Sequence, residues 1–118
     1  MRRGDVVVIA AGGPFTGKPR PAVILQSDAF VLDSITASLV TSERSEALLF
    51  RVPVQPTPRN GLRQDSWIMA DKIVTLRRQH VSRVVGHLDH EDMQRLLGAI
   101  LIFLGMPAAS SSTALDAE

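Results

Sequence analysis

Seven short apolar runs, each bounded by turn residues, occupy the chain from Asp5 to Leu88 and constrain its fold more than any other feature. Their lengths are those of ordinary β-strands, and this region contains no long segment with helical periodicity. The pattern therefore predicts a small β-barrel. The runs are residues 6–9, 22–25, 35–41, 48–52, 67–69, 73–76 and 84–85.

One helix is expected after these runs, so the predicted class is α+β, mainly β. Asp89 is placed as an N-cap, and the first turn holds Glu91 and Asp92, where carboxylates are favoured by the helix dipole. Gly105 ends the helix. An apolar stripe is expected to pack on the barrel; the opposite side is also apolar, which fits a subunit interface and burial under the protein's own loops equally well. The stripe is Met93, Leu96, Leu97, Ile100, Leu101 and Leu104, and the opposite side is Ala99, Ile102 and Phe103.

The length of 118 residues, with 45% hydrophobic residues, is enough for one compact core. We expect one domain over residues 1–105 and a disordered tail over residues 106–118, which are small and polar with an acidic end. The absence of cysteine excludes disulfides, a thiolate metal site and a cysteine nucleophile. With no secretory signal and no apolar stretch long enough to span a membrane, a cytoplasmic protein without membrane association is expected.

Two connections are rich in glycine and proline and are expected to be irregular and exposed. They cover residues 12–21 and 55–64, and the second should project from the barrel with its arginine and amide side chains in water. The net charge of +1 does not indicate nucleic-acid binding by itself, so any basic surface must be local.

Several familiar catalytic and binding motifs are incomplete. Gly12, Gly17 and Lys18 approach a phosphate-binding loop, but Pro19 supplies neither hydroxyl nor N–H, and the next segment is predicted to be a strand. His87 and His90 fall on opposite sides of a strand-to-helix junction, so we expect no metal site. The sequence also lacks a Gly-x-Ser-x-Gly elbow and a His-Glu-x-x-His motif.

The remaining candidate functional residues lie in two places: a loop that ends in Lys18 and Arg20, and a strand that ends in Thr41 and Ser42. Because side chains alternate along a strand, Thr41 should share a face with three apolar residues and place its hydroxyl at the rim of that face. Those residues are Ile35, Ala37 and Leu39.

Six further segments follow one another along the chain: Arg3-Gly4-Asp5-Val6-Val7, Lys18-Pro19-Arg20-Pro21-Ala22-Val23-Ile24-Leu25, Leu39-Val40-Thr41-Ser42, Gly61-Leu62-Arg63-Gln64-Asp65-Ser66, Ala70-Asp71-Lys72-Ile73 and Gly86-His87-Leu88. Taken in this order, they resemble the MazF/PemK-like toxins. The resemblance covers Arg3 to about Gly105, and its most distinctive part is Arg-Pro followed by an apolar strand.

The resemblance implies an SH3-like barrel with a C-terminal helix, a homodimer, and cleavage of single-stranded RNA without metal or cofactor. It further implies a 2′,3′-cyclic phosphate and a 5′-hydroxyl as product ends. Because a basic cleft that admits RNA also attracts carboxylates, we expect inhibition by an antitoxin with an acidic, partly disordered segment. In many members the matching arginine and threonine are catalytic, which assigns that role to Arg20 and Thr41.

Chemistry supports these roles, since a guanidinium can hold two phosphate oxygens and a hydroxyl can hold another. One family branch instead uses an arginine where Met69 stands and a histidine in the first loop; this chain has neither and retains only Asp71, which can be structural. The residues expected to contact the RNA strand, with Phe15 stacking, are Phe15, Lys18, Ser42, Arg44, Gln64 and Ser66.

Two alternative functions remain at this point. One is a non-enzymatic toxin resembling CcdB, which inhibits DNA gyrase through its terminal helix; this chain lacks a C-terminal tryptophan, its only tryptophan being Trp67. The other is a catalytically inactive barrel that binds RNA or a protein.

Overall fold

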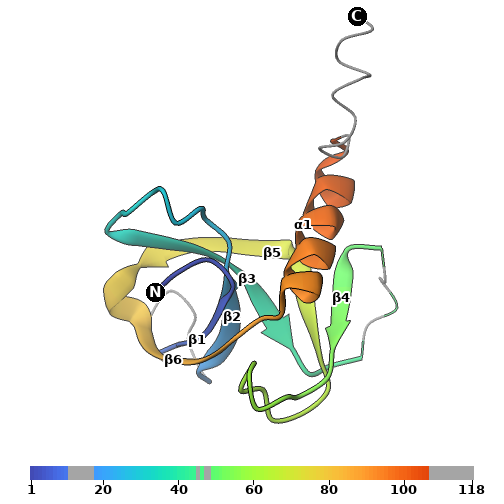
Figure 1. Cartoon of the computed structure of the whole chain (residues 1–118), viewed down its shortest axis with the longest axis horizontal. Helices are drawn as coiled ribbons and strands as arrows, with labels where there is room; N and C mark the ends of the chain where they lie inside the picture. The colour runs from blue at the N-terminus through green and yellow to red at the C-terminus, as the bar shows by residue number, and fades with distance from the viewer. Residues whose placement is uncertain (11–17, 45, 47–48, 107–118) are drawn as a thin grey trace, which may run out of the picture.

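A curved antiparallel sheet and one C-terminal helix make up most of the computed structural model, which describes residues 1–10, 18–44, 46 and 49–106 (Figure 1). Within these residues six strands form a sheet in the order β4-β5-β3-β2-β1-β6. The predicted mainly-β class is confirmed, and the curvature fits an SH3-like barrel. The elements are β1 (Asp5–Ile9), β2 (Arg20–Ile24), β3 (Ser34–Thr41), β4 (Arg51–Val54), β5 (Ser66–Arg77), the 3-10 helix η1 (Arg78–His80), β6 (Val81–His87) and α1 (His90–Leu104).

The strand predictions are wrong at β4 and β5. The runs 67–69 and 73–76 belong to the single strand β5, whose register with β3 shifts between Ser38 and Val40. The charged pair Asp71 and Lys72 interrupts the apolar pattern there, although backbone pairing resumes beyond it. Strand β4 lies later in the chain than the predicted run 48–52. Its alternate residues Val52 and Val54 are buried, and their burial favours the observed position of the strand.

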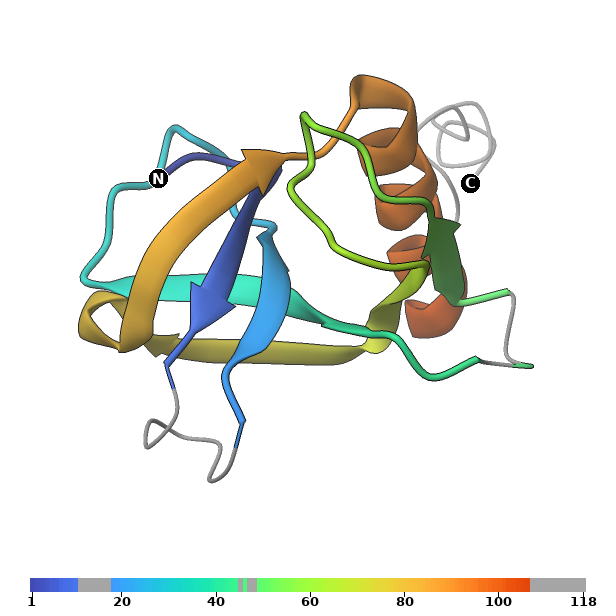
Figure 2. The same ribbon diagram turned by 90° about the horizontal axis from the view of Figure 1, so that it is seen from below.

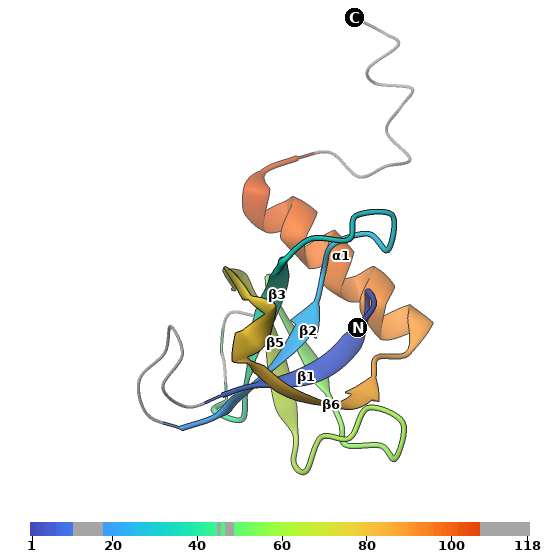
Figure 3. The same cartoon turned by 90° about the vertical axis from the view of Figure 1, so that its left-hand side faces the viewer.

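The sheet buries side chains on both of its faces, in two clusters. Because side chains alternate along a strand, successive residues belong to different clusters: Val6 lies in the outer cluster and Val7 in the inner one. The outer cluster lies under α1, which crosses one side of the sheet (Figure 3) and packs against β4 and β5. This cluster comprises Val6, Val23, Val40, Val52, Val54, Ile68, Ala70, Leu88, Met93, Leu96 and Ala99. The inner cluster comprises Val7, Ile9, Ala22, Ile24, Ile35, Ala37, Leu39, Met69 and Leu76.

Helix α1 begins and ends where the sequence predicts. Asp89 has the extended backbone of an N-cap, but its side chain makes no capping hydrogen bond and its carboxylate lies 3.5 Å from Arg59 Nε. Gly105 ends the helix in the left-handed conformation, with φ of 71°. Within the described part of the chain, no helix is both long and apolar enough to cross a membrane.

The packing of α1 corrects the predicted stripe. Met93 and Leu96 are buried as expected, and so is Ala99, which was placed on the opposite side. Leu104 was expected to pack on the barrel, but it is 56% exposed because the helix extends past the sheet. Ile102 and Phe103 are also largely exposed. The predicted tail at 106–118 lies outside the described residues, except for Met106.

The loop between β4 and β5 is irregular and mostly exposed, with Arg59, Arg63 and Gln64 in solvent as predicted. It does not stand clear of the barrel, however, because its backbone around Asn60 packs against the end of β6 (Figure 2). Asn60 is only 3% exposed: its side chain accepts hydrogen bonds from Thr57 N and Leu62 N and donates one to Gln55 O. These hydrogen bonds satisfy the buried amide of Asn60. The loop can therefore pack on β6, at one edge of the sheet, although it begins at β4, at the other edge.

Two glycines make this contact possible. A Cβ on Gly86 would meet the backbone of Asn60 and the carbonyl oxygen of Arg59, and a Cβ on Gly61, where φ is +69°, would meet the backbone of Val85. The close approach lets His87 N donate to Arg59 O at 2.8 Å.

We expect Gly86→Ala to lower the free energy of unfolding by about 3 kcal/mol, because the added methyl collides with backbone that cannot rotate away. Urea unfolding followed by circular dichroism measures the change. The matched control is Gly98→Ala in α1, where a Cβ has no neighbour within 4 Å; helix propensity should raise its stability by about 0.5 to 1 kcal/mol. Equal effects of the two substitutions would contradict the proposed close packing.

Candidate functional site

Five strand ends meet at one end of the sheet and bring polar side chains together. Ile9 at the end of β1 pairs with Arg20 at the start of β2. Trp67 near the start of β5 pairs with Thr41 at the end of β3 and with Pro53 on β4. Directly opposed residues of antiparallel strands project to the same face. The site is therefore a row of side chains running across the sheet.

Arg20 and Thr41 are neighbours within this row. The last registered pair of β2 and β3 is Ala22 with Leu39, and Arg20 and Thr41 each lie two residues further along these strands, at the same end of the sheet. Ala22 and Leu39 belong to the inner cluster, so Arg20 and Thr41 lie at the rim of that apolar face. The face predicted for Thr41 is thus the one observed. Arg20 is exposed, and Thr41 is half-buried.

The hydroxyl of Thr41 is held by its own backbone turn. Its Oγ1 accepts a hydrogen bond from Glu43 N at 3.1 Å. A hydroxyl has one proton and two acceptor positions, so this bond leaves the proton available for donation. Thr41 can therefore donate to an anionic oxygen that is held by the guanidinium of Arg20 on the neighbouring strand.

The other predicted RNA-contacting residues lie around the same strand ends, with differing exposure. Lys18 precedes β2, Ser42 and Arg44 follow β3, and all three are exposed. Ser66 is only 5% exposed, and its Oγ donates to the carbonyl of Gln64 at 2.8 Å, which shapes the start of β5. The predicted contact Phe15 lies outside the described residues.

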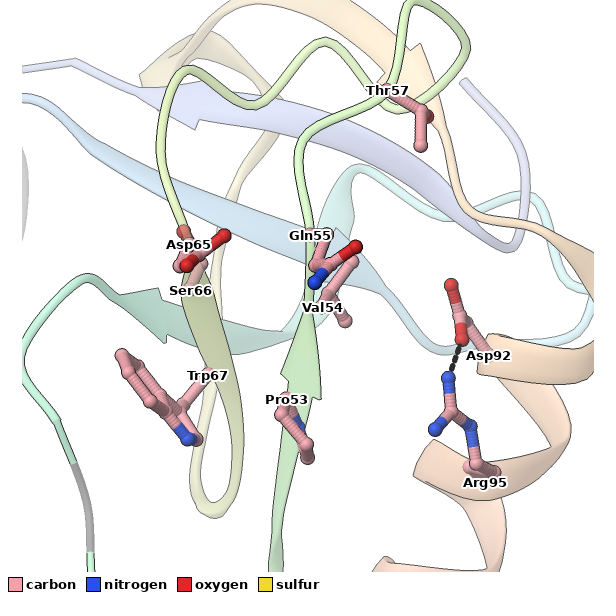
Figure 4. A pocket seen from close by; sticks show the side chains of 9 residues that line it. All are labelled: Pro53, Val54, Gln55, Thr57, Asp65, Ser66, Trp67, Asp92 and Arg95. Carbon is pink, nitrogen blue, oxygen red and sulfur yellow. Dashed lines mark hydrogen bonds and ion pairs between the residues drawn. The ribbon is translucent and has the colours of Figure 1, made fainter.

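Next to the row lies a groove of about 470 Å³ between the ends of β4 and β5 and the first turns of α1 (Figure 4). Trp67 and Pro53 form part of its wall, and the side chains of Asp92 and Arg95, which pair with each other, lie on the helix side. Trp67 was not among the site residues predicted from the sequence. Its position directly after Ser66 at the start of a predicted strand was the only sequence feature that pointed to this site.

Asp71 and Arg51 form a bidentate ion pair between β5 and β4. Arg51 Nε donates to Asp71 Oδ1 at 3.1 Å and Nη2 to Oδ2 at 2.9 Å, and the side chains are 22% and 15% exposed respectively. The hydrogen bonds from Arg51 lower the pKa of Asp71 despite its partial burial, and Asp71 correspondingly raises the pKa of Arg51. The pair joins the two strands that carry Pro53 and Trp67.

The two histidines considered as metal ligands belong to different elements, His87 to β6 and His90 to α1. His87 Nδ1 lies 2.9 Å from Asp5 Oδ1, and the Asp5 carboxylate also accepts a hydrogen bond from Arg2 N. His90 is exposed in the first turn of α1. Over the ranges that the structure describes, no three His, Cys, Asp or Glu side chains are grouped to hold a metal ion.

The fold and the row of strand-end side chains define a small, mainly-β barrel with a guanidinium and a hydroxyl at one rim. Residues 2–104 match the sequence model of the PemK-like, MazF-like toxins of type II toxin-antitoxin systems. The chain belongs to this family.

Individual relatives agree with this assignment. A protein named probable endoribonuclease MazF, from Mycolicibacterium smegmatis, is 43% identical over 107 residues, covering 90% of this chain and 98% of its own. Endoribonuclease EndoA of Bacillus subtilis is 28% identical over 112 residues, covering 90% and 96% of the two chains. The solved structure of Mycobacterium tuberculosis toxin MazF-mt6 has the same fold, with a TM-score of 0.74 at 24% identity over 88% of this chain and 99% of its own.

The ion pair predicts how stability depends on pH. Because the folded-state pKa of Asp71 lies below the ordinary value of 3.8, its contribution is fully present above the unfolded pKa and is lost as pH falls through the folded pKa. Arg51→Met should lower the free energy of unfolding by about 2 kcal/mol at pH 7. Urea unfolding from pH 7 to pH 2.5 should show the difference between wild type and variant constant down to about pH 5 and shrinking below it. A difference that does not depend on pH would contradict the charge pairing.

Proposed function

We propose that this chain is the toxin of a type II toxin-antitoxin system and an endoribonuclease that cuts single-stranded RNA, including mRNA, without a metal ion or cofactor. The observation that carries the proposal is that Arg20 and Thr41 lie on adjacent strands, each two residues beyond the registered pair of Ala22 and Leu39, at the rim of the inner face. Membership in the MazF-like family and the relative named as an endoribonuclease support it.

The proposed reaction uses a nucleophile that the RNA itself provides. The 2′-oxygen bonds to the adjacent phosphorus, the bond from phosphorus to the 5′-oxygen breaks, and the products carry a 2′,3′-cyclic phosphate and a 5′-hydroxyl. The 2′-hydroxyl loses one proton and the leaving 5′-oxygen gains one, so no water is consumed. The enzyme's main task is to stabilise the negative charge that accumulates on the phosphoryl oxygens.

Arg20 and Thr41 are the proposed catalytic residues. The planar guanidinium of Arg20 suits two phosphoryl oxygens, and its charge is permanent at physiological pH. The hydroxyl of Thr41 donates to a further oxygen, since Glu43 N occupies only an acceptor position on Oγ1. Both residues begin or end a strand, so the barrel fixes their backbone before RNA arrives, which reduces the ordering required in the transition state.

Around this pair, the substrate strand is proposed to follow the exposed side chains at the strand ends. These contacts are Lys18, Ser42, Arg44, Gln64 and Ser66, together with the predicted stacking residue Phe15. For Ser66 the available contact is an oxygen lone pair, because its proton is donated to the Gln64 carbonyl.

We further propose a cytoplasmic homodimer, formed by the domain at residues 1–105, that is inhibited by an antitoxin segment. A solved neighbour of the same fold is described as an endoribonuclease in complex with its cognate antitoxin, and another as MazE-MazF of Deinococcus radiodurans. An acidic, partly disordered segment suits the role, because a cleft with cationic side chains that admits RNA also attracts carboxylates.

The first test is cleavage of a mixed-sequence single-stranded RNA in EDTA, with product ends identified by mass spectrometry. Wild type should leave cyclic phosphate and 5′-hydroxyl ends. Arg20→Ala should lower kcat by about 100- to 1000-fold, as expected for the loss of a donor to the transition-state charge. Thr41→Val should lower it by about tenfold through loss of one hydrogen bond.

Matched variants separate the hydroxyl from the shape of the side chain. Thr41→Ser keeps the hydroxyl and should keep most of the activity. Thr41→Val keeps the shape of the side chain and should lose most of the activity. Circular dichroism and size-exclusion chromatography check that each variant keeps its fold and its dimer. Wild type that cuts no RNA would refute the ribonuclease, and loss of DNA gyrase supercoiling in its presence would then establish the gyrase-inhibitor alternative.

A further inference from the structure

Trp67 is the chain's only tryptophan, and it lies in the same cross-strand row as the proposed catalytic pair. Its backbone pairs with Thr41 on one side and with Pro53 on the other, so the three side chains project to one face. Neighbouring strands are about 4.8 Å apart, which places the backbone of Trp67 about 10 Å from that of Arg20, two strands away.

The indole is not accounted for by the hydrophobic core. Trp67 belongs neither to the inner nor to the outer cluster of the described residues, nor to the partly buried side chains packed against them. It is half-buried and forms part of the wall of the 470 Å³ groove, beside the ring of Pro53. A large aromatic surface that stays accessible beside a polar rim is well suited to contact a flat ligand.

We infer that Trp67, supported by Pro53, stacks on the nucleobase next to the phosphate held by Arg20 and Thr41. The inference rests on the proposed ribonuclease function and adds to it a residue that binds the substrate base. Thr41 occupies the strand between Arg20 and Trp67, so one nucleotide can place its phosphate at the pair and its base on the indole. The groove then continues past the indole to the amide of Gln55 and the carboxylate of Asp65.

Stacking acts on binding more than on the chemical step. The base does not change during phosphoryl transfer, so its contact with Trp67 is equal in the bound substrate and in the transition state. A lost stacking contact should therefore raise KM and leave kcat nearly unchanged. Base-aromatic stacking of ordinary strength corresponds to a change of roughly tenfold.

Steady-state cleavage of the same RNA tests this separation. Trp67→Leu should raise KM about tenfold with kcat within about twofold of wild type, and Trp67→Phe should recover most of the affinity because it keeps an aromatic face. The matched control is Phe30→Leu, which removes a 63% exposed aromatic ring in the loop between β2 and β3, at the other end of these strands. Its KM should equal that of wild type. If wild type cleaves RNA and Trp67→Leu leaves KM unchanged, the inference about Trp67 is wrong, whereas the proposed ribonuclease function stands.

Fluorescence of the single tryptophan tests the contact in the wild-type protein. A mixed-sequence 2′-O-methyl oligonucleotide, which cannot be cut, should quench the emission saturably, and Arg20→Ala should weaken the quenching by weakening binding. Quenching without any cleavage of RNA would uphold the base contact and refute the proposed activity. No quenching by the oligonucleotide would overturn the inference. A spectral change that follows protein concentration instead of oligonucleotide would also overturn it, because the indole would then lie at an interface between copies of the chain.

Discussion

The register of β3 against its two neighbours decides which side chains can act together at the rim of the barrel. Thr41 faces Trp67 across β5 and, by continuation of the β2 register, Arg20 on the other side. A shift of one residue would turn the threonine to the opposite face, into the cluster under α1. The apolar side chains Ala37 and Leu39 oppose that shift because they would leave the inner core. Burial of the core thus also positions the hydroxyl.

Strand β5, which carries Trp67, positions the other half of the site. Its irregular pairing with β3 lies around Asp71, whose ion pair with Arg51 ties β5 to β4 next to the groove. At the far edge, the Asn60 loop reaches β6 through contacts that only glycine permits. The edges of the sheet are therefore held by specific polar and backbone contacts, whereas the centre is held by apolar packing.

Much of this could be predicted from the sequence, because local patterns determine it. Alternation predicted the face of Thr41, and the signals at Asp89 and Gly105 predicted the ends of the helix. The continuous β5 could not be predicted, because charged residues interrupt its pattern. Packing of the loop on β6 and the row joining Arg20 to Trp67 depend on residues far apart in the chain, which local patterns do not encode. The choice of Arg20 and Thr41 came from family resemblance, whereas their positions at the ends of adjacent strands came from the structure.

The most direct test of the proposed site is a crystal structure of the protein with a single-stranded RNA whose reactive 2′-hydroxyl is replaced by hydrogen. A phosphate oxygen should lie within hydrogen-bond distance of both the Arg20 guanidinium and Thr41 Oγ1, with the adjacent base lying flat on Trp67. A phosphate bound elsewhere, with Arg20 and Thr41 in contact only with water or protein, would contradict it.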